Sequence, residues 1–499
     1  MKLNHIYKSI ACGVLLAMTA TSCDLDYNPV DTYSDVTEGV NKTDEKPIFN
    51  SVQDVETSMV TLHKKFRDQQ EHWYVDKLLI GDAHSDNAYA GTTGAEVVPY
   101  ETNSIEGSNS VLKRDWDRFL GDIAVANRII VGCDQLKALS ESERGKYQSQ
   151  AKIFRAMVMF DMVRLWGNFP VITTVGGDIT EDNVEEMYPT YFPPQNTAEE
   201  AYAQIEKDLT EAVENPNTPT NDTSDKSILT KSVARAMLAK VYAEKPLRDY
   251  AKVIKYADEL AADGFDLVED FSDLWAYDTE KKDCRVRNTK EAILEAHFPP
   301  GSGNWCTWMF GRNLSNWDES FTWAKWITPS RDLIRLYEEQ GDTKRYNESV
   351  VWYDCGWSNY YPADHYAFMY KCRSAFNSII YLRYADILLL KAEAKIMGEA
   401  PDRIRNRAGL GKLPQSTRSS KEALLQAYMD ERRMELAFEG QRWYDLCRLN
   451  KVEEVMNAVY AKDSGRHAQE NLFNENSYLL AIPQGAIDQN ENLIQNPGY

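Results

Sequence analysis

Tryptophan side chains are concentrated in one stretch of the chain. Five of the 12 tryptophans lie between positions 305 and 326, namely Trp305, Trp308, Trp317, Trp323 and Trp326. A flat indole stacks on the apolar C–H face of a sugar ring, and burying one such face contributes roughly 1–2 kcal/mol. The alternative is a core of aromatic side chains beneath a long loop. For any single ring the core explanation is the stronger, whereas for the cluster we expect at least two rings to be exposed.

A second group of aromatic and polar residues lies nearer the N-terminus. Trp73 and Tyr74 precede a glycine-containing segment that carries Asp86 and Asn87. Carboxylate and amide groups can bind the hydroxyls of a sugar, although a purely local role in a turn explains Asp86 and Asn87 equally well. The candidate ligand-binding residues are therefore Trp73, Tyr74, Asp86, Asn87, Trp305, Trp308, Trp317 and Trp323.

The sequence carries no catalytic or metal-binding signature. The GxSxG, HExxH, P-loop and GxGxxG patterns are all missing. Asp82, His84 and Asp86 alternate like the start of a calcium loop, but the later bidentate acid is missing. The 77 acidic residues leave a glycosidase pair open by count alone, although no segment places two carboxylates in an evident cleft. We expect a binding protein without catalytic residues, metal or cofactor.

Apolar residues recur at helical spacing through most of the chain, which predicts a mainly α fold. The first such face is formed by Val52, Val55, Met59, Leu62 and Phe66. Similar patterns predict helices over residues 111–137, 143–166, 197–214, 230–243, 249–262, 329–340, 380–397 and 420–449. Candidate N-cap residues are Ser142, Thr197 and Ser420.

Two neighbouring helices have the spacing of a repeat unit. Ala239 is followed by Tyr242 three positions later and by Ala251 in the next predicted helix. Small and aromatic residues at these distances are typical of tetratricopeptide repeats, in which alanines let paired helices approach closely. Alanine-rich helix pairs are common, so one unit leaves the repeat assignment open.

The amino-acid composition of the sequence changes between residues 265 and 380. Glycine, proline, asparagine and aromatic residues become dense there, and Pro299 to Gly303 is a clear loop signal. A long irregular stretch in a compact protein usually carries function. The predicted organisation is residues 1–22 as a signal peptide, 23–50 as a tether, 51–264 as an N-terminal helical part, 265–380 as a ligand-binding insert and 381–499 as a C-terminal helical part of one overall domain.

The N-terminus has the form of an export signal that ends at a cysteine. Two lysines precede an apolar run at residues 10–20, which is too short to span a bilayer. The small residues Thr21 and Ser22 then precede Cys23. We expect Cys23 to be lipidated, and several acyl chains would hold the protein firmly on a membrane surface. An ordinary secreted protein with a chance cysteine is the alternative.

Charge and cysteine usage restrict the partners. The full chain has a formal net charge of −21, and without residues 1–22 it has 54 basic and 77 acidic residues, a charge of −23. Such a chain repels nucleic acid. Six cysteines beyond Cys23 show no CxxC pattern and are not a disulfide framework. One or two bridges, with Cys355 and Cys372 as the closest pair in sequence, and buried free thiols both remain open.

Four segments carry long motifs. Residues 153–170 contain Arg-Ala and end in Leu-Trp-Gly-Asn-Phe-Pro, and residues 430–448 contain Glu-Arg-Arg-Met-Glu-Leu followed by Glu-Gly-Gln-Arg-Trp-Tyr-Asp-Leu. Residues 381–394 and the C-terminal stretch 478–499 add Tyr-Leu-Arg-Tyr-Ala-Asp and Asn-Pro-Gly-Tyr. These motifs resemble those of the SusD/RagB family of Bacteroidetes lipoproteins, and the resemblance spans the whole chain.

The resemblance implies both a fold and a function. Family members have a tetratricopeptide-like scaffold and loops that bind the ligand, and they are anchored by lipid at the surface of the outer membrane. They cap a SusC-like TonB-dependent transporter and deliver nutrients to it, usually oligosaccharides and in some cases peptides. The scaffold would face the barrel. Family ligand sites draw on loops that correspond roughly to residues 70–100 and 270–330 here.

The motif at 430–448 has the composition of a scaffold rather than of a ligand site. Its apolar members are Met434, Leu436, Phe438 and Leu446. Its charged members, which we expect to form a partly buried ion network, are Arg432, Arg433, Glu435, Glu439, Arg442 and Asp445. Just upstream, Pro401 limits the helix expected near 398–410, so the last repeat is predicted to be truncated.

Three functions follow, in order of preference. The first is capture of a nutrient glycan for a SusC-like transporter. The second is capture of oligopeptides by a member of the same family. The third is a helical scaffold or adhesin without a nutrient ligand.

Overall fold

The computed structural model describes residues 47–91, 94–177, 184–278, 280–281, 283–298, 303–306, 326–354, 359–395, 400–418 and 420–499. Two units are distinguished. One comprises residues 1–46 and 176–187, and the other comprises residues 47–175 and 188–499. The contacts described below belong to the second unit. Cys23 and most of the predicted tether lie outside the described residues.

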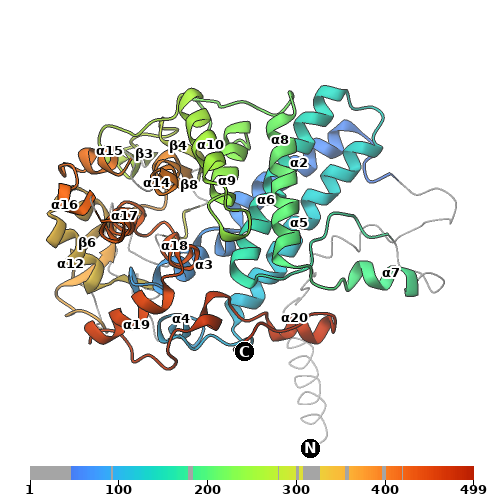
Figure 1. Cartoon of the computed structure of the whole chain (residues 1–499). Coiled ribbons are helices and arrows are strands. Elements are labelled where there is room, and N and C mark those ends of the chain that lie inside the picture. Colours follow the sequence, from blue (N-terminus) through green and yellow to red (C-terminus); the bar gives the residue numbers. More distant parts are fainter. Residues whose placement is uncertain are drawn as a thin grey trace, which may run out of the picture. The chain divides into compact units, whose positions relative to one another are not determined.

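A succession of packed helices forms the scaffold, in which each helix contacts the next one (Figure 1). These helices are α2 (Val52–Asp68), α5 (Ser110–Gln135), α6 (Glu141–Trp166), α8 (Ala198–Glu214), α9 (Lys231–Val241), α10 (Tyr250–Ala262), α14 (Tyr384–Lys395) and α17 (Lys421–Leu436). The predicted mainly α, tetratricopeptide-like architecture is confirmed. The predicted face of α2 is also confirmed, since Val55, Met59, Leu62 and Phe66 are buried and Val52 is partly buried.

Shorter elements connect and cover the scaffold. The helical ones are η2 (Glu71–Val75), α3 (Asp76–Leu78), η3 (Leu79–Ala83), α4 (Val98–Thr102), α7 (Val184–Tyr191), η4 (Lys245–Leu247), η5 (Phe271–Leu274), α12 (Arg331–Gln340), α13 (Thr343–Ser349), α15 (Ala400–Arg407), α16 (Gln415–Arg418), α18 (Arg442–Leu449), α19 (Val452–Lys462), η6 (Glu475–Tyr478) and α20 (Gln484–Gln489). Of these, η2 and η3 are π-helical turns, and such turns are frequent at functional or tightly packed positions.

Four antiparallel strand pairs lie mainly within residues 265–380. They are β1 (Ala88–Ala90) with β5 (Ile327–Pro329), β2 (Tyr277–Asp278) with β3 (Asp283–Cys284), β4 (Ala292–Ala296) with β8 (Ile379–Arg383), and β6 (Val350–Tyr353) with β7 (Tyr366–Met369). The predicted irregular insert therefore contains short strands besides α12 and α13. Pairing of β1 with β5 joins two segments that are more than 200 residues apart in the chain.

Helix starts follow side-chain capping, and one predicted cap was wrong. Thr197 and Ser420 cap α8 and α17 as expected. The cap of α6 is Ser140 rather than Ser142, because Ser140 forms a capping box with Glu143. The Ser140 hydroxyl accepts the Glu143 N–H at 3.2 Å, and the Glu143 carboxylate accepts the Ser140 N–H at 2.9 Å.

The repeat-like pair α9 and α10 does pack together, but not through every predicted residue. Ala239 and Tyr242 are buried, and the rings of Tyr242 and Tyr256 stack with centroids 6.1 Å apart. Ala251 is exposed, so it does not form the close contact between the helices. Burial of Ala257 shows that the apolar face of α10 lies on the other side of the helix from Ala251.

The predicted helix over 420–449 is two helices. Phe438 and Gly440 have φ values of 60° and 69°, which end α17 and turn the chain into α18. The Asp82 carboxylate accepts the N–H groups of both residues, at 3.0 and 2.9 Å, so these two groups of the turn are paired. A Cβ on Gly81 would lie 2.4 Å from the Gly440 backbone, which means that glycine is required for this close contact between η3 and the turn.

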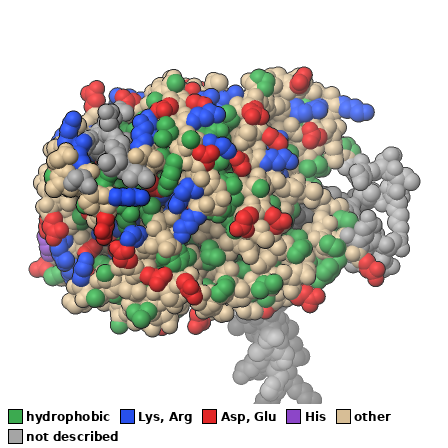
Figure 2. All heavy atoms as spheres, viewed as in Figure 1, with side chains coloured by type: hydrophobic (Ala, Val, Ile, Leu, Met, Phe, Trp, Pro, Cys, Tyr) green, Lys and Arg blue, Asp and Glu red, His purple; other side chains and the backbone are tan. Residues whose placement is uncertain are grey.

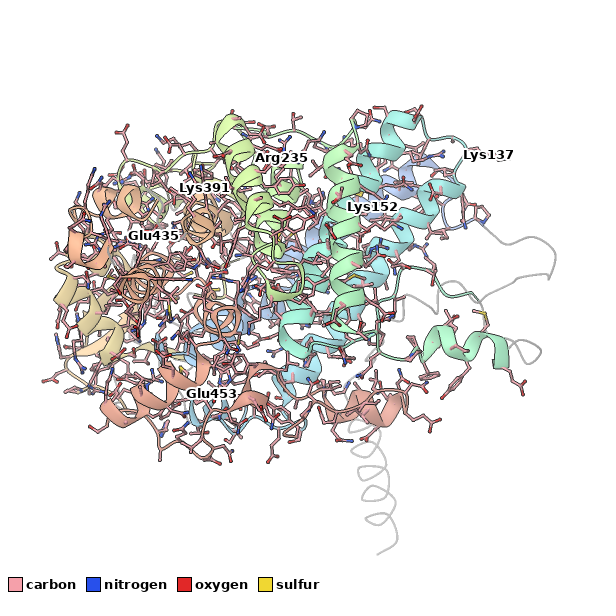
Figure 3. The ribbon with its side chains drawn as sticks, viewed as in Figure 1. Lys137, Lys152, Arg235, Lys391, Glu435 and Glu453 are labelled. Atoms are coloured by element: carbon pink, nitrogen blue, oxygen red, sulfur yellow. The ribbon has the colours of Figure 1, made fainter. Side chains whose placement is uncertain are left out.

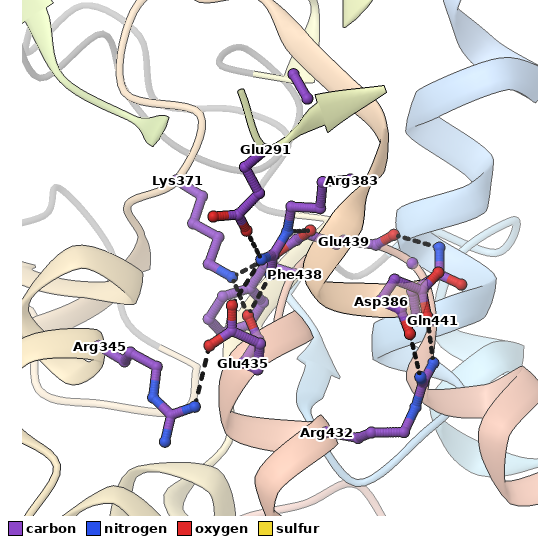
Figure 4. Close-up of polar contacts among 12 residues, drawn as sticks. Glu291, Arg345, Lys371, Arg383, Asp386, Arg432, Glu435, Phe438, Glu439 and Gln441 are labelled. Atoms are coloured by element: carbon purple, nitrogen blue, oxygen red, sulfur yellow. Dashed lines mark hydrogen bonds and ion pairs between the residues drawn. The ribbon is translucent and has the colours of Figure 1, made fainter. Parts of the chain in front are cut away.

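A buried ion network lies where α17 meets β8, β4 and α15 (Figure 4). The Arg383 guanidinium contacts Glu291 at 2.7 Å, Glu435 at 2.6 Å and Glu439 at 2.6 Å. Arg407 also pairs with Glu435. Burial opposes ionisation of Glu435, but the nearby arginines outweigh it and hold the pKa of its carboxyl well below the usual range. Glu435 lies among the packed helices in Figure 3.

The predicted network along 430–448 is confirmed by further pairs. Arg432 bridges Asp386 and Asp445, each at 2.8 Å. Arg433 pairs with Asp332 at 2.8 Å, and the predicted apolar members Met434, Leu436, Phe438 and Leu446 are buried. On the outside, acidic and basic side chains are interspersed (Figure 2).

The end of the repeat region has the predicted short helix. α15 has 8 residues and packs against α14 and α17. Pro401 lies in its first turn, where a missing N–H removes no helical hydrogen bond. Among the residues described, no helix has both the length and the apolar character needed to cross a bilayer.

We predict that Arg383→Met costs about 3–5 kcal/mol of unfolding free energy, because it leaves buried carboxylates without their partner. The matched control is Lys391→Met, which removes the ion pair with Asp258, whose side chain is 57% exposed, and should cost about 0–1 kcal/mol. Urea titrations followed by circular dichroism measure both. Equal, small losses in the two variants would contradict the stabilising role of the network.

Candidate functional site

The candidate site is the described start of the tryptophan-rich segment, residues 303–306. Of the tryptophans in the described part of the chain, Trp305 alone is exposed, at 37%. It follows the buried Asn304 and precedes the buried Cys306. Trp305 is therefore an exposed residue between two buried ones.

The main chain of this segment is held from two sides. Gln70, at the junction of α2 and η2, donates from Nε2 to the Gly303 carbonyl at 2.9 Å and accepts the Trp305 N–H at 2.8 Å. On the other side, the Asn304 N–H donates to the Ala375 carbonyl at 2.7 Å. These bonds join the segment to parts of the chain that precede and follow it by many residues.

Cys306 anchors the same segment in the interior. Its N–H donates to Asn304 Oδ1 at 2.9 Å. Burial and the neighbouring Cys372 thiol raise the pKa of Cys306 well above its usual range, so the group is a neutral thiol at physiological pH. Cys133, Cys284, Cys306, Cys372 and Cys447 are all free thiols. Because Cys372 is a free thiol, the bridge left open between Cys355 and Cys372 is absent, and Cys355 itself lies outside the described residues.

The described residues that follow the tryptophan-rich segment are joined to β1 and the residue after it. Trp308, Trp317 and Trp323 lie outside the described residues, and the chain is described again from Trp326, which is half-buried. The Trp326 carbonyl accepts the Gly91 N–H at 3.1 Å, and the Gly91 carbonyl accepts Nδ2 of Asn359 at 3.1 Å.

A second aromatic surface lies on the β6–β7 hairpin. The rings of Trp352 and His365 are parallel within 3°, with centroids 4.3 Å apart. Trp352 Nε1 donates to the Tyr346 hydroxyl at 2.8 Å, and Tyr353 is 40% exposed. The stacked His365 covers one face of Trp352, so this indole is less accessible than Trp305.

Trp73 and Tyr74 are buried in the helical scaffold. Trp73 is 0% exposed, and its Nε1 donates to Asp122 of α5 at 3.0 Å. The Phe66 ring packs edge-on against both residues. Neither ring offers a face to a sugar in this structure, because helices α2, α5 and α6 surround the segment that carries them.

Asp86 and Asn87 are likewise occupied by the scaffold. The Arg442 guanidinium donates to both Asp86 oxygens, at 2.7 and 2.9 Å. Arg433 Nε donates to Asn87 Oδ1 at 3.0 Å. Burial opposes ionisation of Asp86, yet Arg433 and Arg442 hold the pKa of its carboxyl below the usual range. We therefore leave Trp73, Tyr74, Asp86 and Asn87 out of the proposed ligand surface.

Gln70 and Asn304 were missed by the sequence analysis. Gln70 follows the last turn of a helix, where polar residues are common, and its partners lie 233 and 235 residues later. Neither residue belongs to a periodic pattern or a motif. In the described part of the chain, no three His, Cys, Asp or Glu side chains are grouped so that they could hold a metal.

Two buried carboxyl groups lie close together nearby. Asp76 of α3 and Asp115 of α5 are 0% and 1% exposed, and Arg114 pairs with Asp76. Burial, the adjacent Asp76 charge and a hydrogen bond between the two carboxyls raise the pKa of Asp115 well above its usual range. The surroundings of Asp115 therefore disfavour the charged form of its carboxyl.

Two models of known protein families match this chain. The model described as "SusD family" matches residues 304–499, and a SusD-like model described as "Starch-binding associating with outer membrane" matches residues 32–243. The chain belongs to the SusD/RagB family. The two matched ranges include both halves of the candidate site, Gln70 and residues 304–306.

Relatives of known sequence and structure agree with this assignment. A SusD-like protein of Bacteroides ovatus is 25% identical over 487 residues, which cover 88% of this chain and 81% of the relative. The crystal structure of a SusD superfamily protein from Parabacteroides distasonis has a TM-score of 0.72 at 19% identity, covering 90% of this chain and 100% of that one. Surface glycan-binding protein A from Bacteroides thetaiotaomicron, in complex with laminarihexaose, has a TM-score of 0.68 at 17% identity, with 89% and 99% covered.

The Asp76–Asp115 pair predicts a pH dependence. Because the pKa of Asp115 is raised on folding, the folded state binds more protons than the unfolded state above pH 3.8, the ordinary value. Stability should therefore fall as the pH rises through the raised pKa. Asp115→Asn should remove this loss, because its amide can donate to Asp76 at every pH, and its advantage over the wild type should grow with pH.

Thermal unfolding between pH 5 and 9 measures this effect. Asp115→Ala, which donates nothing, should be less stable than the wild type throughout. A wild type and an Asp115→Asn variant with parallel pH profiles would show that Asp115 is ionised in the folded protein.

Proposed function

We propose that this protein is a lipid-anchored, surface-exposed glycan-binding protein that delivers an oligosaccharide to a SusC-like TonB-dependent transporter in the outer membrane. The observation that carries the proposal is the exposed indole of Trp305 at the base of the tryptophan-rich loop. One family model matched by the chain is described as starch-binding, and a relative of the same fold binds laminarihexaose.

The proposed ligand surface consists of Trp305 with Trp308, Trp317 and Trp323 from the same loop. A single indole contributes only about 1–2 kcal/mol on a sugar face, so several of these rings act together on successive sugar units. The formal net charge of −21 suits a neutral glycan better than an acidic one. Binding occurs without bond cleavage.

The remaining parts of the proposal concern location. Cys23 is lipidated after removal of residues 1–22, residues 23–50 act as a tether, and 51–264, 265–380 and 381–499 form the helical, ligand-binding and C-terminal parts. The helical scaffold contacts the transporter. Basic and acidic side chains mixed over the outside, as in Figure 2, fit a polar interface with a membrane protein.

Trp305→Ala should weaken glycan binding roughly 5- to 30-fold, because one stacked ring is lost. Isothermal titration of the anchor-free protein against host, plant and microbial glycans, with oligopeptides alongside, measures the affinities. Tyr499→Ala is the control, since Tyr499 is 44% exposed but lies outside the loop. Binding of peptides alone would replace the glycan by the peptide function, and release of shorter sugars would reveal an enzyme.

Cys23→Ala should release the protein from the outer membrane, because the acyl chains that hold it there are then absent. Fractionation of cells followed by mass spectrometry of the N-terminal peptide measures both location and lipidation. Solubilised wild-type protein should co-purify with a TonB-dependent barrel. Purification of the anchored protein alone would contradict the proposed partner.

A further inference from the structure

We propose that Gln70 is the positioning residue of the glycan site, and that its side-chain amide sets the orientation of Trp305 by binding the main chain on both sides of Asn304. This inference rests on the proposed function, because it assigns to a residue of the scaffold the task of fixing the exposed indole. Gln70 itself does not touch the ligand.

The geometry is that of a two-point attachment. Gln70 is 2% exposed, so water does not compete for its amide. It donates to the Gly303 carbonyl at 2.9 Å and accepts the Trp305 N–H at 2.8 Å. One planar group thus fixes the main chain at two points, one on each side of Asn304, and the direction of the Trp305 Cα–Cβ bond follows from the main chain between them.

The opposite side of the segment is fixed independently. Asn304 is 0% exposed, and its Nδ2 donates to the Asn377 carbonyl at 3.0 Å while its Oδ1 accepts the Cys306 N–H at 2.9 Å. Gly303 has a φ of 50°, in the left-handed region that favours glycine. The main chain of residues 303–306 is therefore held on both sides, and the Trp305 indole projects from it.

Of the side chains of glutamine, glutamate and methionine, only the glutamine amide satisfies both partners at neutral pH. An ionised carboxylate accepts from Trp305 but repels the Gly303 carbonyl, and a thioether of similar size makes neither bond. A buried main-chain group that loses its partner is costly, so the segment would shift to find another. If Trp305 is not held in its binding orientation before the glycan arrives, the glycan binds more weakly, because the conformational entropy lost on ordering Trp305 opposes binding.

The test uses Gln70→Met and Gln70→Glu, with Gln69→Met as the matched control. Gln69 is the adjacent glutamine, and its Oε1 has no hydrogen-bond partner in the described structure. At pH 8, Gln70→Met and Gln70→Glu should each weaken glycan binding roughly tenfold, while Gln69→Met should bind like the wild type. The titration uses whichever glycan binds the wild type.

The Gln70→Glu variant adds the pH dependence of glycan affinity as a second readout. A residue that only stabilised the fold would not produce this pH dependence. Burial beside a carbonyl raises the pKa of the introduced carboxyl. When protonated, it can donate to Gly303 and accept from Trp305 as the glutamine does. Its affinity should therefore recover as the pH falls from 8 to 5, whereas Gln70→Met should stay weak and the wild type should change little.

The outcomes separate this inference from the proposed function. If Trp305→Ala binds glycan normally, the proposed site is wrong. If Trp305→Ala loses affinity while Gln70→Met binds like the wild type, or if Gln70→Glu shows no recovery at low pH, the site stands and Gln70 does not position it.

If the Gln70 variants do not fold, a measurement on the wild-type protein tests the same proposal. Hydrogen exchange of the wild-type Trp305 amide should be slow, because Gln70 accepts this N–H in a buried position. Exchange at the rate of an unprotected amide would overturn the proposal.

Discussion

Pairing of buried arginines with carboxylates from distant segments is the constraint on which the rest of the structure depends. Arg383 at the end of β8 contacts Glu291, Glu435 and Glu439. Glu291 immediately precedes β4, Glu435 belongs to α17, and Glu439 lies in the turn after α17. A buried charge without partners costs several kcal/mol, so these segments are confined to one arrangement. Such a network adds little net stability compared with an apolar core, but it selects one geometry.

Hydrogen bonds from single side chains connect this arrangement to the candidate site. Asp82 accepts two N–H groups of the turn between α17 and α18, which places η3 against the C-terminal helices. The segment just before η2 then presents Gln70 to residues 303–305. The proposed glycan platform is thus attached to the scaffold as well as to its own segment, which agrees with the general rule that binding sites need a rigid support.

Periodic patterns predicted the scaffold well, whereas contacts between distant residues were not predictable. The spacing of Val55, Met59, Leu62 and Phe66 identified the buried face of α2, because helical geometry alone determines it. Burial of Trp73 and exposure of Trp305 depend on tertiary packing. A tryptophan side chain has the same hydrophobicity at both positions, so the sequence predicts both residues as candidate ligand contacts. The sequence favours hydroxyl binding or a local turn role for Asp86, yet its partner Arg442 lies 356 residues away, beyond any local pattern.

The central claim is that the glycan binds to a platform that already exists in the free protein. The most direct measurement is a crystal structure of the anchor-free protein with its bound glycan. The account predicts a sugar ring stacked on Trp305, with the hydrogen bonds from Gln70 to Gly303 and Trp305 unchanged. A sugar bound away from residues 303–326, or a main chain at 303–306 that has released Gln70, would contradict it.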